Sequence, residues 1–265
     1  MPTLVWATDI HLNFIERPAR DRFHEEIVAT GADVVLIGGD IGEADDVESL
    51  MIALAEHVAR PVYFVLGNHD FYGGSIAEVR SRMVALSARD HWLRWLPTSG
   101  VVALSATTAL VGHDGWSDGR FGNYARSPVM LNDYLRIAEL SGLSPAARLT
   151  KLNALGDEAA AHFARAVPAA LERFEEVVVL THVPPFREAC WHEGKISNDD
   201  FLPHFSSKAP GIALLDAARA HCDRNVLVLC GHTHGEGEAQ IARKLRVRTG
   251  GAVYGATAVS VIEVA

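Results

Sequence analysis

The fold class of this chain is indicated most clearly by residues 33–40, Asp33-Val34-Val35-Leu36-Ile37-Gly38-Gly39-Asp40. Its apolar part is a continuous, largely β-branched run, which is typical of a strand buried on both faces. The two glycines that follow have no side chains to obstruct close approach to the Asp40 carboxylate. A buried strand followed directly by a polar loop is typical of a parallel α/β sheet, in which ligands bind at the carboxyl ends of the strands.

The segments on either side of residues 33–40 alternate between strand and helix. Apolar runs predict neighbouring strands at residues 3–7 and 62–66, and helical spacing predicts helices at residues 20–30, 45–60 and 75–88. Repeated β-α-β units imply a mostly parallel sheet with right-handed crossovers.

The pattern changes at about residue 96. Strands without intervening helices are expected over 96–111, followed by a long loop at 112–128 and a helical stretch that is interrupted near Ser144-Pro145. A second strand–helix series covers 177–229, and closing strands follow in 239–264. The sequence contains no repeat, low-complexity tract or linker. We therefore predict a single domain over residues 1–265, with a loop and helical insert at about 112–170.

Composition limits the class of protein. The chain of 265 residues is 49% hydrophobic and 22% charged, which is typical of a globular protein. Its formal net charge of −9 argues against a nucleic-acid polymer as partner, since such partners are bound through basic patches. The 3 cysteines form no CxxC pair, and no apolar stretch approaches the roughly 18 residues of a membrane span. We expect a cytoplasmic protein with no membrane partner, and a homo-oligomer is possible.

Five polar segments, each directly after an apolar run, carry the candidate chemistry. They are Asp9-Ile10-His11, Gly39-Asp40, Gly67-Asn68-His69-Asp70, Thr181-His182 and Gly231-His232-Thr233-His234. Because strand ends converge at one edge of an α/β sheet, these segments are expected to form one site. Their Asp, His and Asn side chains can hold two adjacent metal ions that share a bridging carboxylate, an arrangement that activates water against phosphorus.

Each segment alone has an ordinary structural interpretation. Asp9 and His11 face the same side of an extended segment, but such a pair also occurs in solvated loops. Gly39-Asp40 is equally typical of a turn, although the two oxygens of Asp40 can bridge two cations. The presence of all five segments in one order is what indicates a metal site.

His69 and Asp70 are the candidate catalytic residues. His69 is expected to point away from the metal ligands, and Asp70 to hold its imidazole by a hydrogen bond that fixes the tautomer. His69 is then available to protonate a leaving oxygen or to stabilise the transition state.

These residues resemble the pattern of the calcineurin-like metallophosphoesterase superfamily: D-x-H, G-D-x-x-[DN], G-N-H-[DE], an isolated His and G-H-x-H. The resemblance implies an α/β fold, a four-layer αββα sandwich of two mixed sheets, with a dinuclear metal site at the carboxyl ends of the strands. It assigns one metal to Asp9, His11, Asp40 and His234, and the other to Asp40, Asn68, His182 and His232, with a bridging hydroxide as nucleophile. The ions are expected to be two divalent or trivalent transition metals, of which Mn, Fe, Zn and Ni are the candidates.

Differences from the family pattern indicate which branch of the family this chain most resembles. Glu43 stands where the family often has Asp or Asn, a supporting position whose change leaves metal binding in place. The G-D-x-V-D-R-G motif of Ser/Thr protein phosphatases is not matched. The contexts of Asp9 and His182 most resemble small phosphodiesterases of cyclic nucleotides and glycerophosphodiesters.

Substrate choice is expected to depend on two loops around the metal centre. The first offers His113, Trp116 and Arg120, which suit phosphate pairing and stacking on a base or aryl group. The second offers Trp191 and His192. For Trp116, packing onto the core is an equally good interpretation.

The sequence therefore predicts a dinuclear metal-dependent phosphoesterase, acting as a phosphodiesterase on a small molecule. A phosphomonoesterase or a nucleotide hydrolase of the same fold is the alternative within the enzyme class. A nuclease is disfavoured by the acidic composition. From another class, a catalytically silent metal-binding scaffold is opposed by the presence of every ligand position.

Overall fold

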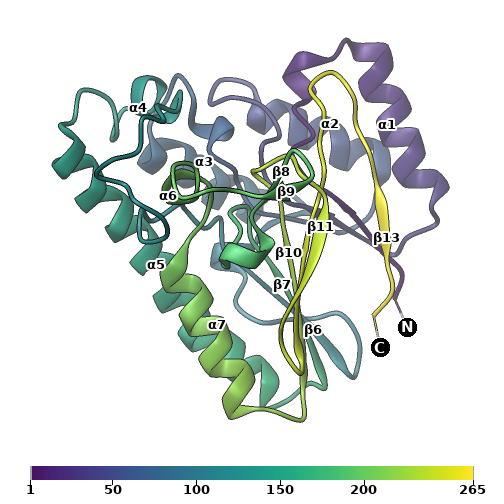
Figure 1. Cartoon of the computed structure of the whole chain (residues 1–265). Coiled ribbons are helices and arrows are strands. Elements are labelled where there is room, and N and C mark those ends of the chain that lie inside the picture. Colours follow the sequence, from purple (N-terminus) through teal and green to yellow (C-terminus); the bar gives the residue numbers. More distant parts are fainter. Residues whose placement is uncertain (1, 265) are drawn as a thin grey trace.

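The computed structural model describes residues 2–264 and contains two large β-sheets with helices on their outer sides (Figure 1). The first sheet has the strand order β13-β1-β2-β3-β4. Its strands are β1 (Leu4–Ala7), β2 (Val34–Ile37), β3 (Val62–Phe64), β4 (Leu93–Trp95) and β13 (Ser260–Ile262). Strands β1 to β4 pair in parallel, and β13 pairs antiparallel to β1.

Helices connect the parallel strands of the first sheet, as the β-α-β pattern requires. They are α1 (Arg17–Ala29), α2 (Val47–Val58) and α3 (Ile76–Arg89). Each helix begins within three residues of its predicted start. The helical spacing of the apolar residues is therefore sufficient to locate these helices in the sequence. Their inner faces pack on the strands through Phe23, Ile27, Leu54 and Met83, all of which are buried.

The second sheet has the strand order β11-β12-β10-β7-β6-β5. Its strands are β5 (Val102–Ala103), β6 (Thr108–Gly112), β7 (Glu176–Leu180), β10 (Asn225–Cys230), β11 (Gly237–Ala242) and β12 (Leu245–Thr249). The four inner strands pair in parallel, and β5 and β11 pair antiparallel at the edges. Helices α5 (Pro145–Leu171) and α7 (Lys208–Ala220) lie side by side over the outer face of this sheet (Figure 1).

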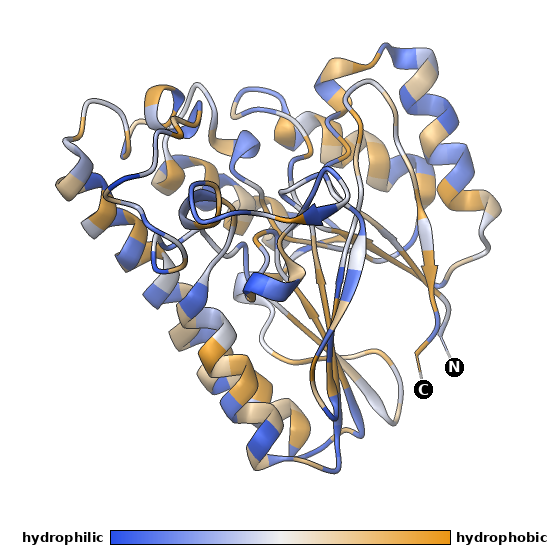
Figure 2. Ribbon diagram, viewed as in Figure 1, coloured by the Kyte–Doolittle hydropathy of each residue, from blue (hydrophilic) through white to orange (hydrophobic). Residues whose placement is uncertain are grey.

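Three apolar clusters show that the molecule has four layers. One lies between the first sheet and α1 to α3, and a second lies between the second sheet and the pair α5 and α7. The third joins Trp6 and Leu36 of the first sheet to Leu110, Val178 and Leu229 of the second. The hydrophobic strands at the centre of Figure 2 contrast with the hydrophilic outer faces of the helices. The predicted αββα sandwich of two mixed sheets is confirmed.

The segment between β6 and α5 contains the loop predicted over 112–128, but it has less helix before Ser144 than the sequence predicted. A loop covers residues 113–132, and the short helix α4 (Asp133–Arg136) follows it. The small hairpin of β8 (Trp191–His192) and β9 (Lys195–Ile196) and the helix α6 (Leu202–Phe205) complete the loops above the strand ends. Within residues 2–264, the structure offers no helix with both the length and the apolar character needed to cross a membrane.

Candidate metal centre

The carboxyl ends of strands from both sheets bring the seven predicted ligands together. Asp9 and His11 follow β1, Asp40 follows β2, Asn68 follows β3, His182 follows β7, and His232 and His234 follow β10. Backbone and side-chain contacts join the two sheets at this point, since the amide of His232 donates to the Asp9 carboxylate at 2.9 Å. The site therefore forms where the two sheets meet.

The first ligand group consists of Asp9, His11, Asp40 and His234. One donor atom from each lies within 4.8 Å of the donor atoms of the other three. The Nε2 atoms of His11 and His234 are 3.2 Å apart, and each also faces a carboxylate, Asp40 at 3.7 Å and Asp9 at 3.4 Å. Two imidazoles and two carboxylates arranged in this way suit a transition-metal ion.

The second ligand group consists of Asp40, Asn68, His182 and His232. The Asn68 Oδ1 lies 3.2 Å from Nε2 of His182 and 2.9 Å from Nδ1 of His232. The His182 Nε2 is also 3.4 Å from Oδ1 of Asp40. Because Oδ2 of Asp40 faces His11, its two oxygens face different groups, as expected of a bridging ligand.

The orientation of the two rings in the second group shows that a cation fits there. The Nδ1 atom of His182 donates to the Gly38 carbonyl at 2.9 Å, and Nε2 of His232 donates to the His204 carbonyl at 3.1 Å. Each neutral ring therefore carries its hydrogen on the outer nitrogen and presents a lone pair inward. Those lone pairs face the Asn68 and Asp40 oxygens, so only acceptors meet at this point, and a metal ion satisfies all of them.

The pKa values of the ligands point in the same direction. Burial raises the pKa of Asp9 to about 7, and burial together with the charges of Asp9 and Asp70 raises that of Asp40 well above its usual range. Burial and neighbouring imidazoles lower the pKa of His11 to about 2, and of His234 to about 4. The metal-free site thus holds neutral histidines next to carboxylates that are costly to ionise, and cations remove that cost.

Most of the predicted ligands have a left-handed backbone conformation. The structure gives a positive φ to seven non-glycine residues in its described part, and five of these are predicted ligands: Asp9, His11, Asp40, His232 and His234, with φ from 40° to 71°. Such a conformation costs a side-chain-bearing residue about 1–3 kcal/mol and is found mostly at functional sites. The strain is thus concentrated at the strand ends that carry the donors.

Asp70 does not contact His69 in the way the sequence predicted. Its Oδ1 accepts the amides of Ile41 and Gly42 at 2.8 and 2.9 Å, and its Oδ2 accepts the amide of Gly67 at 2.8 Å. The Nδ1 of His69 is buried without a hydrogen-bond partner. Asp70 therefore holds together the loops that carry Asp40 and Asn68, and the prediction that it orients His69 is wrong.

The residues predicted in the two substrate loops lie in different places, and few of them are at the site. Trp116 is only 3% exposed and packs against Phe71, so it belongs to the core. His113 is buried beside Glu158, and Arg120 forms ion pairs with Asp118 and Asp157. These three residues do not line the pocket at the metal ligands.

Of the two residues singled out in the second predicted loop, Trp191 and His192, one lines that pocket. His192 does so, and its Nδ1 donates to the Thr233 carbonyl at 3.0 Å. Trp191 lies behind it, because its indole fills the space where a side chain of Gly237 would stand.

The pocket at the ligands has a volume of about 270 Å³. Its lining also includes residues that were not singled out from the sequence, among them Tyr72, Asp133, Phe205 and Tyr254. They lie outside the motifs, on segments whose position relative to the strand ends depends on tertiary folding. Tyr254 packs over the rings of His11 and His234, with centroids 4.6 and 4.9 Å away, and covers the first ligand group.

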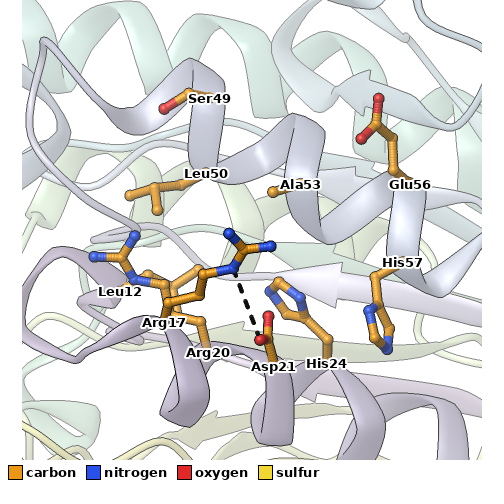
Figure 3. Close-up of a pocket in the computed structure, with 10 residues that line it drawn as sticks. All are labelled: Leu12, Arg17, Arg20, Asp21, His24, Ser49, Leu50, Ala53, Glu56 and His57. Carbon is orange, nitrogen blue, oxygen red and sulfur yellow. Dashed lines mark ion pairs between the residues drawn. The ribbon is translucent and has the colours of Figure 1, made fainter.

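A larger cavity, of about 560 Å³, lies elsewhere, between α1 and α2 (Figure 3). Arg17 and Asp21 form an ion pair in its wall, and the rings of His24 and His57 face each other across the two helices at 5.3 Å. None of the residues that line it is a predicted metal ligand. The chemistry of the chain is therefore concentrated in the smaller pocket.

A two-sheet sandwich with Asp, Asn and His donors at its strand ends is the arrangement of a metal-dependent phosphoester hydrolase. A family model, described as calcineurin-like phosphoesterase, matches residues 2–236. The chain belongs to this family, and the predicted enzyme class is confirmed. A search of curated proteins finds no match.

Solved structures support the fold. The chain is similar to phosphopantetheinyl hydrolase from Mycobacterium tuberculosis, with a TM-score of 0.65, 17% identity, and coverage of 94% of this chain and 89% of that one. It is also similar to a dimetal phosphatase from Danio rerio, with a TM-score of 0.60, 14% identity, and coverage of 98% and 92%. At these identities the likeness concerns the fold.

Proposed function

We propose that this enzyme hydrolyses small phosphodiesters at a two-metal centre. In this proposal Asp9, His11, Asp40 and His234 hold one ion, and Asp40, Asn68, His182 and His232 hold the other. Two bound ions supply an ionised water at neutral pH and stabilise negative charge at phosphorus. Mn, Fe, Zn and Ni are the candidate metals, because carboxylate, amide and imidazole donors suit this group of ions.

The charge of the pocket is the observation that supports a preference of the enzyme for diesters over monoesters. Within the described chain, the residues that line the pocket include no Lys or Arg, and they include the carboxylate of Asp133. A phosphomonoester has a second ionisation near pH 6, so it brings an extra negative charge at neutral pH. Arg136 does not line the pocket, and Glu43 balances its charge, because the two side chains pair at 2.6 Å beside the Tyr72 ring. A diester brings one negative charge, which the ions balance.

The first test compares a diester with its matched monoester. With Mn, Fe, Zn or Ni supplied in turn, kcat/KM for bis(p-nitrophenyl) phosphate is expected to exceed that for p-nitrophenyl phosphate by at least about tenfold, or about 1.4 kcal/mol. A phosphopantetheinyl diester and a nucleoside monophosphate extend the comparison to natural leaving groups. A preference for the monoesters would show a phosphatase or nucleotide hydrolase, and hydrolysis of none of them with any metal would show a scaffold.

His69 is proposed as a hydrogen-bond donor to the reacting phosphoryl group. It lines the pocket, and its ring centroid lies 4.7 Å from that of His11. Burial and the nearby imidazoles of His232 and His234 lower its pKa to about 3, so the ring is neutral at pH 7 and donates one N–H. It acts by stabilising charge rather than as an imidazolium acid.

His69→Ala is expected to lower kcat by about 10²–10³-fold, the usual cost of removing one such donor. Metal content, measured by plasma mass spectrometry, is expected to stay at the wild-type value. The matched control is His57→Ala, an exposed histidine in the cavity of Figure 3. A loss of metal in the His69 variant would make it a ligand and contradict this role.

A further inference from the structure

The short helix α4 contacts Asn68 directly and reaches His232 through His204, and neither of these two ligands belongs to the first group. We infer that Asp133 and Tyr134 of α4 are positioning residues for the second metal ion, acting through Asn68 and His232. The inference rests on the ligand assignment in the proposed function. By this inference, the helix α4 in the segment between β6 and α5 has a role in the metal centre.

Asp133 fixes which end of the Asn68 amide faces the metal site. Its Oδ1 accepts the Nδ2 of Asn68 at 2.8 Å and the hydroxyl of Tyr72 at 2.7 Å. The Tyr72 oxygen also accepts Nδ2 of Asn68 at 3.1 Å. A carboxylate can accept only from the amide nitrogen, so the Asn68 Oδ1 is held on the opposite side, toward His182 and His232.

Burial makes this orientation strict. Asp133 is 1% exposed and Asn68 is 7% exposed, so water does not readily replace either partner. Without Asp133, the amide can turn and present its NH₂ group to the metal position, where a nitrogen with no free lone pair binds no ion. Partners of this kind orient ligands in metalloenzymes, and their loss lowers metal affinity.

Tyr134, the next residue of α4, supports the other ligand. Its hydroxyl bonds Nδ1 of His204 at 2.5 Å, and the Ser127 hydroxyl bonds Nε2 of the same ring at 3.0 Å. The backbone carbonyl of His204 accepts Nε2 of His232 at 3.1 Å, which turns Nδ1 of His232 toward Asn68. Tyr134 therefore helps to hold His204, whose backbone carbonyl fixes the tautomer of a ligand that Tyr134 does not touch.

The first ligand group has different supports. The Thr8 hydroxyl and the His232 amide hold Asp9, and Tyr254 packs on His11 and His234. The hydrogen bonds described for Asp133 and Tyr134 reach none of Asp9, His11 and His234. Changes in α4 should consequently weaken one ion and spare the other.

The experiment titrates chelator-treated protein with Mn²⁺ by calorimetry and by electron paramagnetic resonance, which detects coupling between paired ions. Wild type is expected to bind two ions. Asp133→Ala is expected to bind the second about 10–100-fold more weakly, with the first unchanged and the coupling signal lost. Tyr134→Phe is expected to weaken the second ion less, because Ser127 still holds His204.

Leu135→Ala is the matched control, since this α4 residue is 69% exposed. Asp133→Asn keeps the side-chain volume and serves if the Ala variant does not fold; it too is expected to weaken only the second ion. Tight binding of both ions by Asp133→Ala, or equal loss of both ions by a folded variant, overturns the inference and leaves the proposed function standing. Binding of fewer than two ions by wild type overturns the proposed function itself.

Discussion

An Asp40→Asn variant is expected to lose both metal ions and at least about 10³-fold in kcat/KM, or about 4 kcal/mol of transition-state stabilisation. The reason is the position of Asp40, whose Oδ2 faces His11 at 3.7 Å while its Oδ1 faces His182 at 3.4 Å. Asparagine has the same shape but only one oxygen and no charge. It therefore cannot bridge the two ligand groups.

Metal analysis and thermal melting check this expectation together. Removing an ion present at about 100 times its Kd should cost the wild-type protein about 2.7 kcal/mol of stability, and should cost the variant almost nothing. Asp45→Asn is the matched control, because Asp45 is exposed and close in sequence. A variant that keeps two ions and wild-type turnover would contradict the bridging role.

The same melts, repeated across pH, test the electrostatics of the site. In metal-free wild type the pKa of Asp9 is about 7, against an ordinary value of 3.8, and that of Asp40 is also raised. A carboxyl whose pKa is raised by folding favours the folded state while protonated, and that stability is lost as pH rises through the raised pKa. Metal-free wild type should become less stable between about pH 4 and pH 7, and Asp40→Asn should show a smaller loss.

The second large effect is expected at Asp70. Asp70→Ala should lower the free energy of unfolding by at least about 3 kcal/mol, since it leaves three backbone amides unpaired at about 1–3 kcal/mol each where they are buried. Those amides belong to Ile41, Gly42 and Gly67, which flank two of the ligands. Stability should fall even in the metal-free protein.

Urea unfolding of chelator-treated proteins measures this loss. Asp70→Asn is expected to lie between wild type and Asp70→Ala, because its single oxygen retains part of the bonding. Unchanged stability together with a fall in kcat like that of His69→Ala would instead support the catalytic partnership predicted from the sequence.

The sequence was most informative where physical requirements are local. The β-branched run of β2 and the glycines after it predict a buried strand whose end approaches other backbone closely. In the structure a side chain at Gly39 would meet the backbone of Gly67 at 2.5 Å. The order of the five segments led to the fold class, and the structure brings all seven candidate ligands together.

Contacts between distant segments were not predictable in the same way. From the sequence alone, Asp70 looks like a hydrogen-bond partner for its neighbour His69. In the structure its oxygens instead accept three backbone amides from two loops. Trp116 lies in a polar loop, and only the packed structure places it against Phe71. Asp133 and Tyr254 follow no motif, and their place in the pocket depends on how the long loops cross the strand ends.

The contact that joins the two sheets has a consequence for how the protein is made. The His232 amide and the Asp9 carboxylate are 223 residues apart in sequence. During synthesis, N-terminal segments emerge and begin to fold first. Asp9, His11, Asp40 and Asn68 are therefore available long before His232 and His234 leave the ribosome. With the proposed ligand set, complete metal loading is expected only after translation of the last parallel strands, because a nascent chain has only part of the donors.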